Sequence, residues 1–159
     1  MNFDNHTRIW FDGSVKPTNP GFAAGAAIIK RPGNAVEDIV VTQFLDWGTS
    51  NEAEYAGLIA GLKKAKELEI KQILVFGDSL LIVNQVNLVW RTLATNLKPL
   101  LKESRSLLAY FETWQMYWIP RQRNTVADAA AGNCLDLSIQ NMGIPYEYLI
   151  EKFKARPSS

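Results

Sequence analysis

The chain has 159 residues, of which 47% are hydrophobic and 21% are charged, and its formal net charge at pH 7 is +1. These values are typical of one globular domain with a substantial core, and no run approaches the ~18 apolar residues that a membrane-spanning helix needs. One cysteine, Cys134, and one histidine, His6, exclude an internal disulfide framework and a cysteine/histidine zinc site.

Three strand-like runs open the chain, at about residues 7–13, 22–30 and 37–45. The connecting segments KPTNPG and RPGN carry the glycine, proline and asparagine signals of hairpin connections. We therefore predict three antiparallel strands.

The pattern becomes helical from Asn51, where apolar residues recur at a spacing of three and four. Gly57 and Gly61 lie one turn apart in this helix, and because glycine is a poor helix former they indicate a close approach of another backbone. A buried strand, KQILVFGD, follows, and then helices at about 79–90 and 95–111, a fifth strand, WQMYWIP, and a helix beginning at NTVADAAAGN. This order predicts a mixed α/β (α+β) fold, with a five-stranded mixed sheet flanked by helices.

The chain contains no repeat or linker, and we expect a single domain over residues 1–159, with a core at about 7–140 and a helical extension at about 141–159. In the extension, Tyr146, Leu149, Ile150 and Phe153 have the spacing of an amphipathic helix docked on the core. The N-terminal segment MNFDNHTR lacks the apolar region of a signal peptide, so we expect a cytoplasmic protein with no membrane association. No feature indicates a protein partner, and we expect a monomer.

Four acids stand at strand ends or in first helical turns: Asp12, Glu54, Asp78 and Asp128. Asp78 could simply cap the next helix, because aspartate is a preferred N-cap. Asp12, placed directly after an apolar run at the expected end of its strand, has no such explanation, and an isolated buried carboxylate is costly.

A capping role also has to be considered for Glu54 and Asp128. Glu54 could complete a capping box begun at Asn51, and Glu52 could equally answer Thr49. Asp128 follows the expected cap, Asn124, by four residues, which weakens a capping role. The alternative is that all four acids converge on Mg²⁺, a hard ion that prefers oxygen ligands and can drive in-line displacement at phosphorus.

Five segments occur in a recognisable order: FDGS, NPG, TSNEAEYAGLIAGL, VFGDSLLIVNQV and IPRQRNTVADAAA. Together they resemble the type 1 ribonuclease H family. The resemblance implies a five-stranded mixed sheet and an endonuclease that hydrolyses the RNA strand of RNA/DNA hybrids with two Mg²⁺ ions, or Mn²⁺ as an alternative, leaving 5′-phosphate and 3′-hydroxyl ends. It also assigns catalysis and metal binding to Asp12, Glu54, Asp78 and Asp128.

Substrate contacts follow from the same resemblance. It assigns contacts with the hybrid's minor groove to Asn19, Ser50, Asn51 and Gln85. It assigns contacts with the DNA strand to three further residues: Thr49 and Asn84 would bind a phosphate, and Trp90 would provide an aromatic contact. The 49–51 segment could instead only cap its helix, and Trp90 could belong to the core. Three further substrate contacts are expected: Gly13, which would let the backbone leave the strand, Ser14 and Arg121.

This sequence departs from the family pattern in three places, one of which is the C-terminal extension described above. Trp118 stands near the position of a loop histidine found in many members, and we expect the metal-driven chemistry to survive this difference. The 87–111 segment is too short and leucine-rich to form the basic protrusion of many relatives, which leaves five residues as phosphate contacts: Lys98, Lys102, Arg105, Arg121 and Arg123. We therefore expect weak, salt-dependent substrate binding.

The sequence is compatible with two rival functions. One is a non-catalytic module that binds a hybrid or RNA on the same fold. The other is a different metal-dependent nuclease of the ribonuclease H-like superfamily, such as a junction resolvase or an integrase core. The four acids argue against the first, and the polar TSN segment before Glu54 argues against the second.

Overall fold

A computed structural model describes residues 5–33 and 36–143. Its five strands form one sheet in the order β3-β2-β1-β4-β5. Antiparallel pairing joins β1, β2 and β3, whereas β4 runs parallel to β1 and β5 runs parallel to β4, so the predicted mixed sheet is confirmed. The strands are β1 (Thr7–Lys16), β2 (Phe22–Lys30), β3 (Ile39–Phe44), β4 (Gln72–Gly77) and β5 (Thr113–Trp118).

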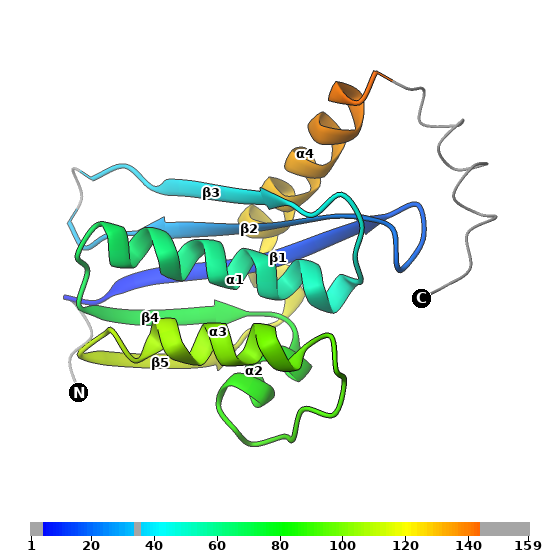
Figure 1. The fold of residues 1–159 in the computed structure, drawn as a ribbon. Helices are drawn as coiled ribbons and strands as arrows, with labels where there is room; N and C mark the ends of the chain where they lie inside the picture. The colour runs from blue at the N-terminus through cyan, green and yellow to red at the C-terminus, as the bar shows by residue number, and fades with distance from the viewer. Residues whose placement is uncertain (1–4, 34–35, 144–159) are drawn as a thin grey trace.

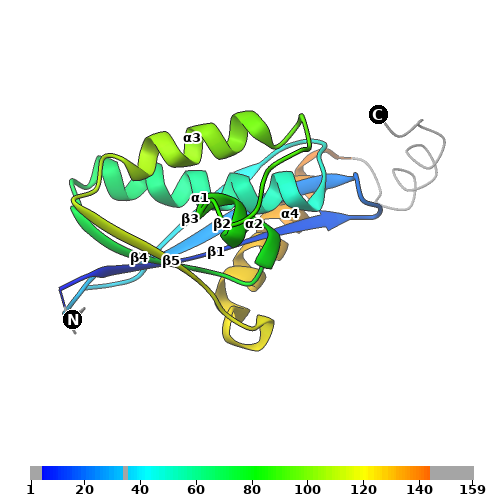
Figure 2. The same cartoon turned by 90° about the horizontal axis from the view of Figure 1, so that it is seen from below.

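Helices cover the two faces of the sheet unequally (Figures 1 and 2). One face carries α1 and α3, with α2 beside them, and α4 is the only described helix on the other face, where it packs mainly on β2 and β1. The helices are α1 (Ser50–Glu67), α2 (Leu80–Val86), α3 (Lys98–Leu108) and α4 (Thr125–Asn141), and a short 3-10 turn, η1 (Arg121–Arg123), precedes α4.

The main core lies between the sheet and α1, where large apolar side chains such as Phe11, Leu58 and Leu62 are fully buried. A smaller cluster on the other face joins Phe22 and Ala24 of β2 to Leu135 and Ile139 of α4. Because β2 is covered on both faces, its buried positions are continuous and no polar alternation is present.

Several bounds differ from the sequence prediction. The predicted 79–90 helix ends at Val86, because Leu88 adopts a left-handed backbone with φ 59° and cannot continue it. The helix predicted at 95–111 begins only at Lys98, next to Pro99, whose ring favours a first helical turn. No described helix is long and apolar enough to cross a membrane. The extension expected beyond Gly143 lies outside the described residues.

Candidate active site

Strand β1 has different neighbours along its length. It pairs with β2 from Arg8 to Lys16, but its parallel pairing with β4 ends at Phe11 and Gly77. Asp12 is the first residue beyond that point, and it lies inside β1 opposite Ala26, so the prediction that it ends its strand is wrong. The sheet opens between β1 and β4 at Asp12, which gives its side chain neighbours from several elements.

Glycines allow helix α1 to lie against this part of β1. A Cβ atom at Gly13 would lie 2.4 Å from the backbone nitrogen of Glu54, and one at Gly57 would lie 2.6 Å from the carbonyl oxygen of Asp12. Gly13 itself stays in β1 opposite Gly25, so it does not lead the backbone out of the strand. The close approach predicted from Gly57 is confirmed, and it places Glu54 beside Asp12.

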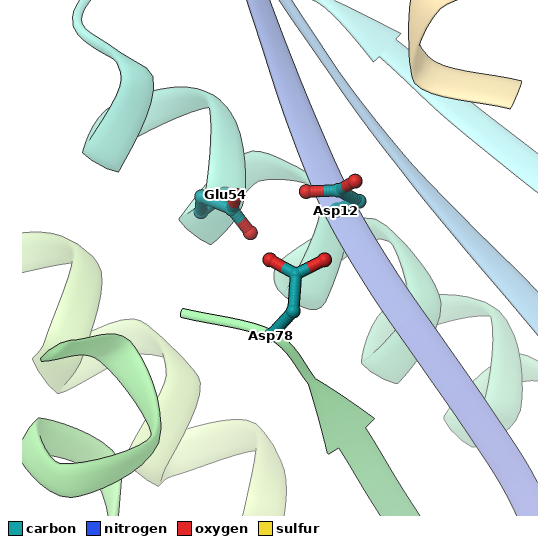
Figure 3. A group of neighbouring side chains, drawn as sticks. All are labelled: Asp12, Glu54 and Asp78. Atoms are coloured by element: carbon teal, nitrogen blue, oxygen red, sulfur yellow. The ribbon is translucent and has the colours of Figure 1, made fainter. Parts of the chain in front are cut away.

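Asp78 follows β4, and the structure shows that it does not cap α2. Ser79 does so, since its side chain accepts a hydrogen bond of 3.2 Å from the Ile82 amide. The Asp78 carboxylate instead turns towards Asp12 and Glu54 (Figure 3). A carboxylate oxygen of each of these three residues lies within 4.8 Å of those of the other two.

Capping at α1 is also settled. Thr49 accepts from the Glu52 amide at 3.1 Å, and Glu52 Oε1 accepts from the Thr49 amide at 2.9 Å. Glu52 is thus the reciprocal member of the capping box, and Glu54 is free for the acidic cluster.

The carboxylates of the cluster form no ion pair with any residue in the part of the chain that the structure describes. Burial raises the pKa of Glu54 strongly, and the nearby Asp12 and Asp78 add to the shift. Burial also raises the pKa of Asp12 to about 6, with a contribution from Asp78, although the hydrogen bond with Glu54 acts in the opposite direction. Glu54 Oε2 is buried and has no hydrogen-bond partner among the described residues, while Asp12 Oδ1 accepts from the Gly13 amide at 2.8 Å. Three oxygen donors, one with an unpartnered buried atom, fit a hard divalent cation.

Asp128, in the first turn of α4, is more peripheral. It lines a cleft of about 590 Å³ together with Asp12, Glu54 and Asp78, and it contributes to the raised pKa of Asp12. It is not part of the tight group of three. The four predicted acids therefore share one cleft but are not equivalent.

The predicted substrate-contact residues fall into two groups. Six line the same cleft as the acids: Gly13, Ser14, Asn19, Ser50, Asn51 and Arg121. Asn19 Nδ2 donates to Ser50 Oγ at 3.0 Å, and the Ser50 amide donates to Asn19 Oδ1 at 3.0 Å, so two remote segments are held together at the rim.

The other four lie away from the cleft lining: Thr49, Asn84, Gln85 and Trp90. Gln85 is only 3% exposed, and its Oε1 accepts from the Tyr55 hydroxyl at 2.7 Å, which makes it a packing residue between α2 and α1. Trp90 is 44% exposed, so it does not belong to the core.

Two residues gain contacts at the site that the sequence did not reveal. Asn124 was expected to cap α4, yet its side chain makes no capping bond; its Nδ2 donates to Phe11 O at 2.9 Å and to Asp78 Oδ2 at 3.0 Å. Trp118, at the end of β5, donates from Nε1 to the Asp78 carbonyl at 3.0 Å. Both orient Asp78, and neither role has a local sequence signal.

The comparisons with known proteins agree with this geometry. Residues 10–134 match the family model described as "Reverse transcriptase-like". Ribonuclease HI of Halobacterium salinarum is 35% identical over 128 residues, which cover 80% of this chain and 63% of that protein. The chain belongs to the type 1 ribonuclease H family.

Solved structures give the same result. The crystal structure of the Halobacterium salinarum RNase H1 superposes with a TM-score of 0.76 at 32% identity, covering 82% of this chain and 98% of that one. The N-terminal RNase H domain of Rv2228c from Mycobacterium tuberculosis superposes with a TM-score of 0.80 at 32% identity, covering 86% and 98%. The chain spans only 34% of the full bifunctional protein Rv2228c, and it is 33% identical to it over 123 residues, or 77% of this chain.

Proposed function

We propose that this chain is a metal-dependent endonuclease that hydrolyses the RNA strand of RNA/DNA hybrids. The observation that carries the proposal is the group of three carboxylates, Asp12, Glu54 and Asp78, gathered where β1 and β4 separate. A protein that only bound hybrids would gain nothing from buried acids facing phosphates. The family membership and the names of its ribonuclease H relatives support the same activity.

Asp12, Glu54 and Asp78 would hold the metal, with Asp128 at the edge of the same cleft. Mg²⁺ is the proposed ion, with two per site when substrate is bound. Held there, it would supply the Lewis-acid chemistry for in-line hydrolysis at phosphorus, for which we propose 5′-phosphate and 3′-hydroxyl products. Asn124 and Trp118 fix Asp78 from its side chain and its carbonyl.

Hybrid selection is assigned to the polar rim of the cleft. The Asn19–Ser50 pair and Asn51 offer amide and hydroxyl groups to 2′-hydroxyls, which distinguish RNA from DNA. Arg121 lines the same cleft and provides a cation for a backbone phosphate.

One experiment tests the proposal. End-labelled RNA/DNA hybrid, duplex DNA and duplex RNA of the same sequence are incubated with Mg²⁺ or with EDTA. We expect cleavage only of the RNA strand of the hybrid, only with Mg²⁺, and with 5′-phosphorylated products. Binding of the hybrid without cleavage would refute the enzyme, and cleavage of duplex DNA would point to another nuclease on this fold.

A further inference from the structure

A second pocket lies on the α4 side of the sheet, and it shares no lining residue with the acidic cleft. It encloses about 260 Å³, slightly below the roughly 300–1,000 Å³ of small-molecule sites in general, so it suits one small ligand and not a duplex. Strands β1 and β2 form its floor, and the first turn of α4 forms one wall. The lining residues are Trp10, Ile28, Lys30, Asp38, Arg123, Asn124, Val126 and Ala127.

The apolar part of this pocket is held rigidly. Trp10 and Ile28 are directly opposite each other in the β1–β2 ladder. Trp10 stacks on Phe76 with ring centroids 5.4 Å apart, and Phe76 stacks on Tyr117 at 6.0 Å, so aromatic rings of two further strands, β4 and β5, support the indole. A braced aromatic wall of this kind provides a stacking surface for a planar ring at little entropic cost.

The polar part favours an anion. Lys30 and Arg123 line the pocket, and neither forms an ion pair within the described ranges 5–33 and 36–143. Arg123, Val126 and Ala127 bring the start of α4 to the pocket, where the helix dipole is positive and no side chain caps the free amides. Asp38 is the one acid in the lining, and its charge opposes an anion.

Asn124 provides an independent sign of a ligand. It is 1% exposed and lines the pocket, and its Nδ2 is committed to two acceptors, Phe11 O and Asp78 Oδ2. This fixes the amide orientation and leaves Oδ1 as a buried acceptor with no partner among the described residues. A ligand with an anionic group satisfies the two cations, and the lining contains, in Asn124, a buried acceptor that the described residues leave unsatisfied.

We propose that the pocket binds a single nucleotide, with its phosphate near Lys30, Arg123 and the start of α4, and its base against Trp10. The nucleotide is either free or the end of a single strand, since both present the same chemistry. The site is separate from the acidic cleft and does not depend on the proposed nuclease activity. It touches that cleft through Asn124, whose amide joins the pocket to Asp78.

The test is calorimetric titration of the metal-free protein, in EDTA, with 5′-AMP, adenosine, inorganic phosphate and a 5′-phosphorylated RNA tetranucleotide. EDTA prevents cleavage and removes metal-bridged binding at the acids. We expect 5′-AMP to bind more tightly than adenosine or phosphate, with a shift of the Trp10 indole N–H signal in NMR spectra. Tighter binding of the tetranucleotide than of 5′-AMP would support a strand end as the source, and weaker binding would support a free nucleotide.

Charge-reversal variants locate the site. Arg123→Glu and Lys30→Glu should each weaken 5′-AMP binding about tenfold or more, because each replaces a phosphate partner by a repelling charge. Asp38→Asn should strengthen binding, and Lys66→Glu, the same charge change at an exposed position of α1, should leave it unchanged. The exposed positions of Lys30 and Arg123 keep these variants folded.

Three results would overturn the proposal: no binding of 5′-AMP at millimolar concentration, phosphate binding as tightly as 5′-AMP, or equal losses in Arg123→Glu and Lys66→Glu. The first means that the pocket holds water only. The second means a simple anion site, and the third means non-specific attraction to a cationic surface.

Discussion

The two halves of β1 differ in almost every physical respect. From Arg8 to Phe11 the strand pairs with β2 on one side and β4 on the other, and its inward side chains, Ile9 and Phe11, are fully buried and apolar. From Asp12 to Lys16 it pairs only with β2, and it carries the acid of the candidate site and the ion pair from Lys16 to Asp136 of α4. The first half of the strand thus packs in the core, and the second half carries the acid of the candidate site.

The largest expected effect on activity comes from replacing Asp12, which lies at the junction of the two halves. Asp12→Asn should lower the rate of hybrid cleavage at least about 10³-fold, because it removes a metal ligand and its charge. Its melting temperature in EDTA should equal or exceed that of the wild type, since repulsion within the acid cluster falls. Asp38→Asn, the same change at an exposed position outside the acidic cleft, is the matched control and should alter neither quantity. A clear loss of stability in Asp12→Asn would mean that Asp12 is structural.

In the first half of the strand the effect should be on stability alone. Ile9 is fully buried in the main core, and Ile9→Ala should lower the free energy of unfolding by about 2–4 kcal/mol through lost burial and a cavity. Urea denaturation measures the change. The cleavage rate of the folded fraction should stay close to that of the wild type, and a selective loss of activity would show that the two halves are not separable.

Asn124 should show an intermediate effect, because it connects Phe11 of the first half to Asp78 beside the second. Asn124→Ala should reduce the cleavage rate about 10–100-fold by releasing Asp78, as loss of an outer partner of a metal ligand typically does. A positioning role predicts that higher Mg²⁺ concentration restores part of the rate. Unchanged Mg²⁺ dependence, with only a lower melting temperature, would indicate a purely structural amide.

The smallest expected effect is on the pH dependence of the metal-free protein. The folded pKa of Asp12 is raised from 3.8 to about 6, so this carboxyl favours the folded state while protonated, below about pH 4, and loses that contribution as the pH rises through 6. Between pH 4 and pH 7, wild-type stability in EDTA should fall by about 1–2 kcal/mol relative to Asp12→Asn. Denaturation of both proteins across this range measures the difference, and parallel curves would contradict the raised pKa.

Much of the fold followed from local patterns. Hydrophobic periodicity and turn residues predicted all five strands and their mixed pairing, and Gly57 predicted the close approach of α1. The bounds were less predictable, because the end of α2 depends on the left-handed backbone at Leu88, a leucine that carries no stop signal. In sequence, that segment reads as a longer amphipathic helix.

The site was predictable only in part for a similar reason. The acids could be identified, but the capping partners of α1 and α2 are decided by three-dimensional contacts, and Glu52 and Ser79 take roles that neighbouring acids could have filled. The sequence places Gln85 among polar residues that could contact substrate, whereas in the structure its side chain accepts a hydrogen bond from the Tyr55 hydroxyl. Asn124 has the sequence position of a cap, and only the folded chain reveals that its amide is used elsewhere.

The bond from Asn124 to Phe11 joins residues 113 positions apart. During synthesis, Asp12, Glu54 and Asp78 leave the ribosome before Asn124, so a nascent chain that contains all three acids still lacks the amide that anchors Asp78. The candidate active site is therefore complete only after α4 has packed on β2 and β1. A chain interrupted before residue 124 would contain Asp12, Glu54 and Asp78, but it would lack both the Asn124 amide that holds Asp78 and the fourth acid of the cleft, Asp128.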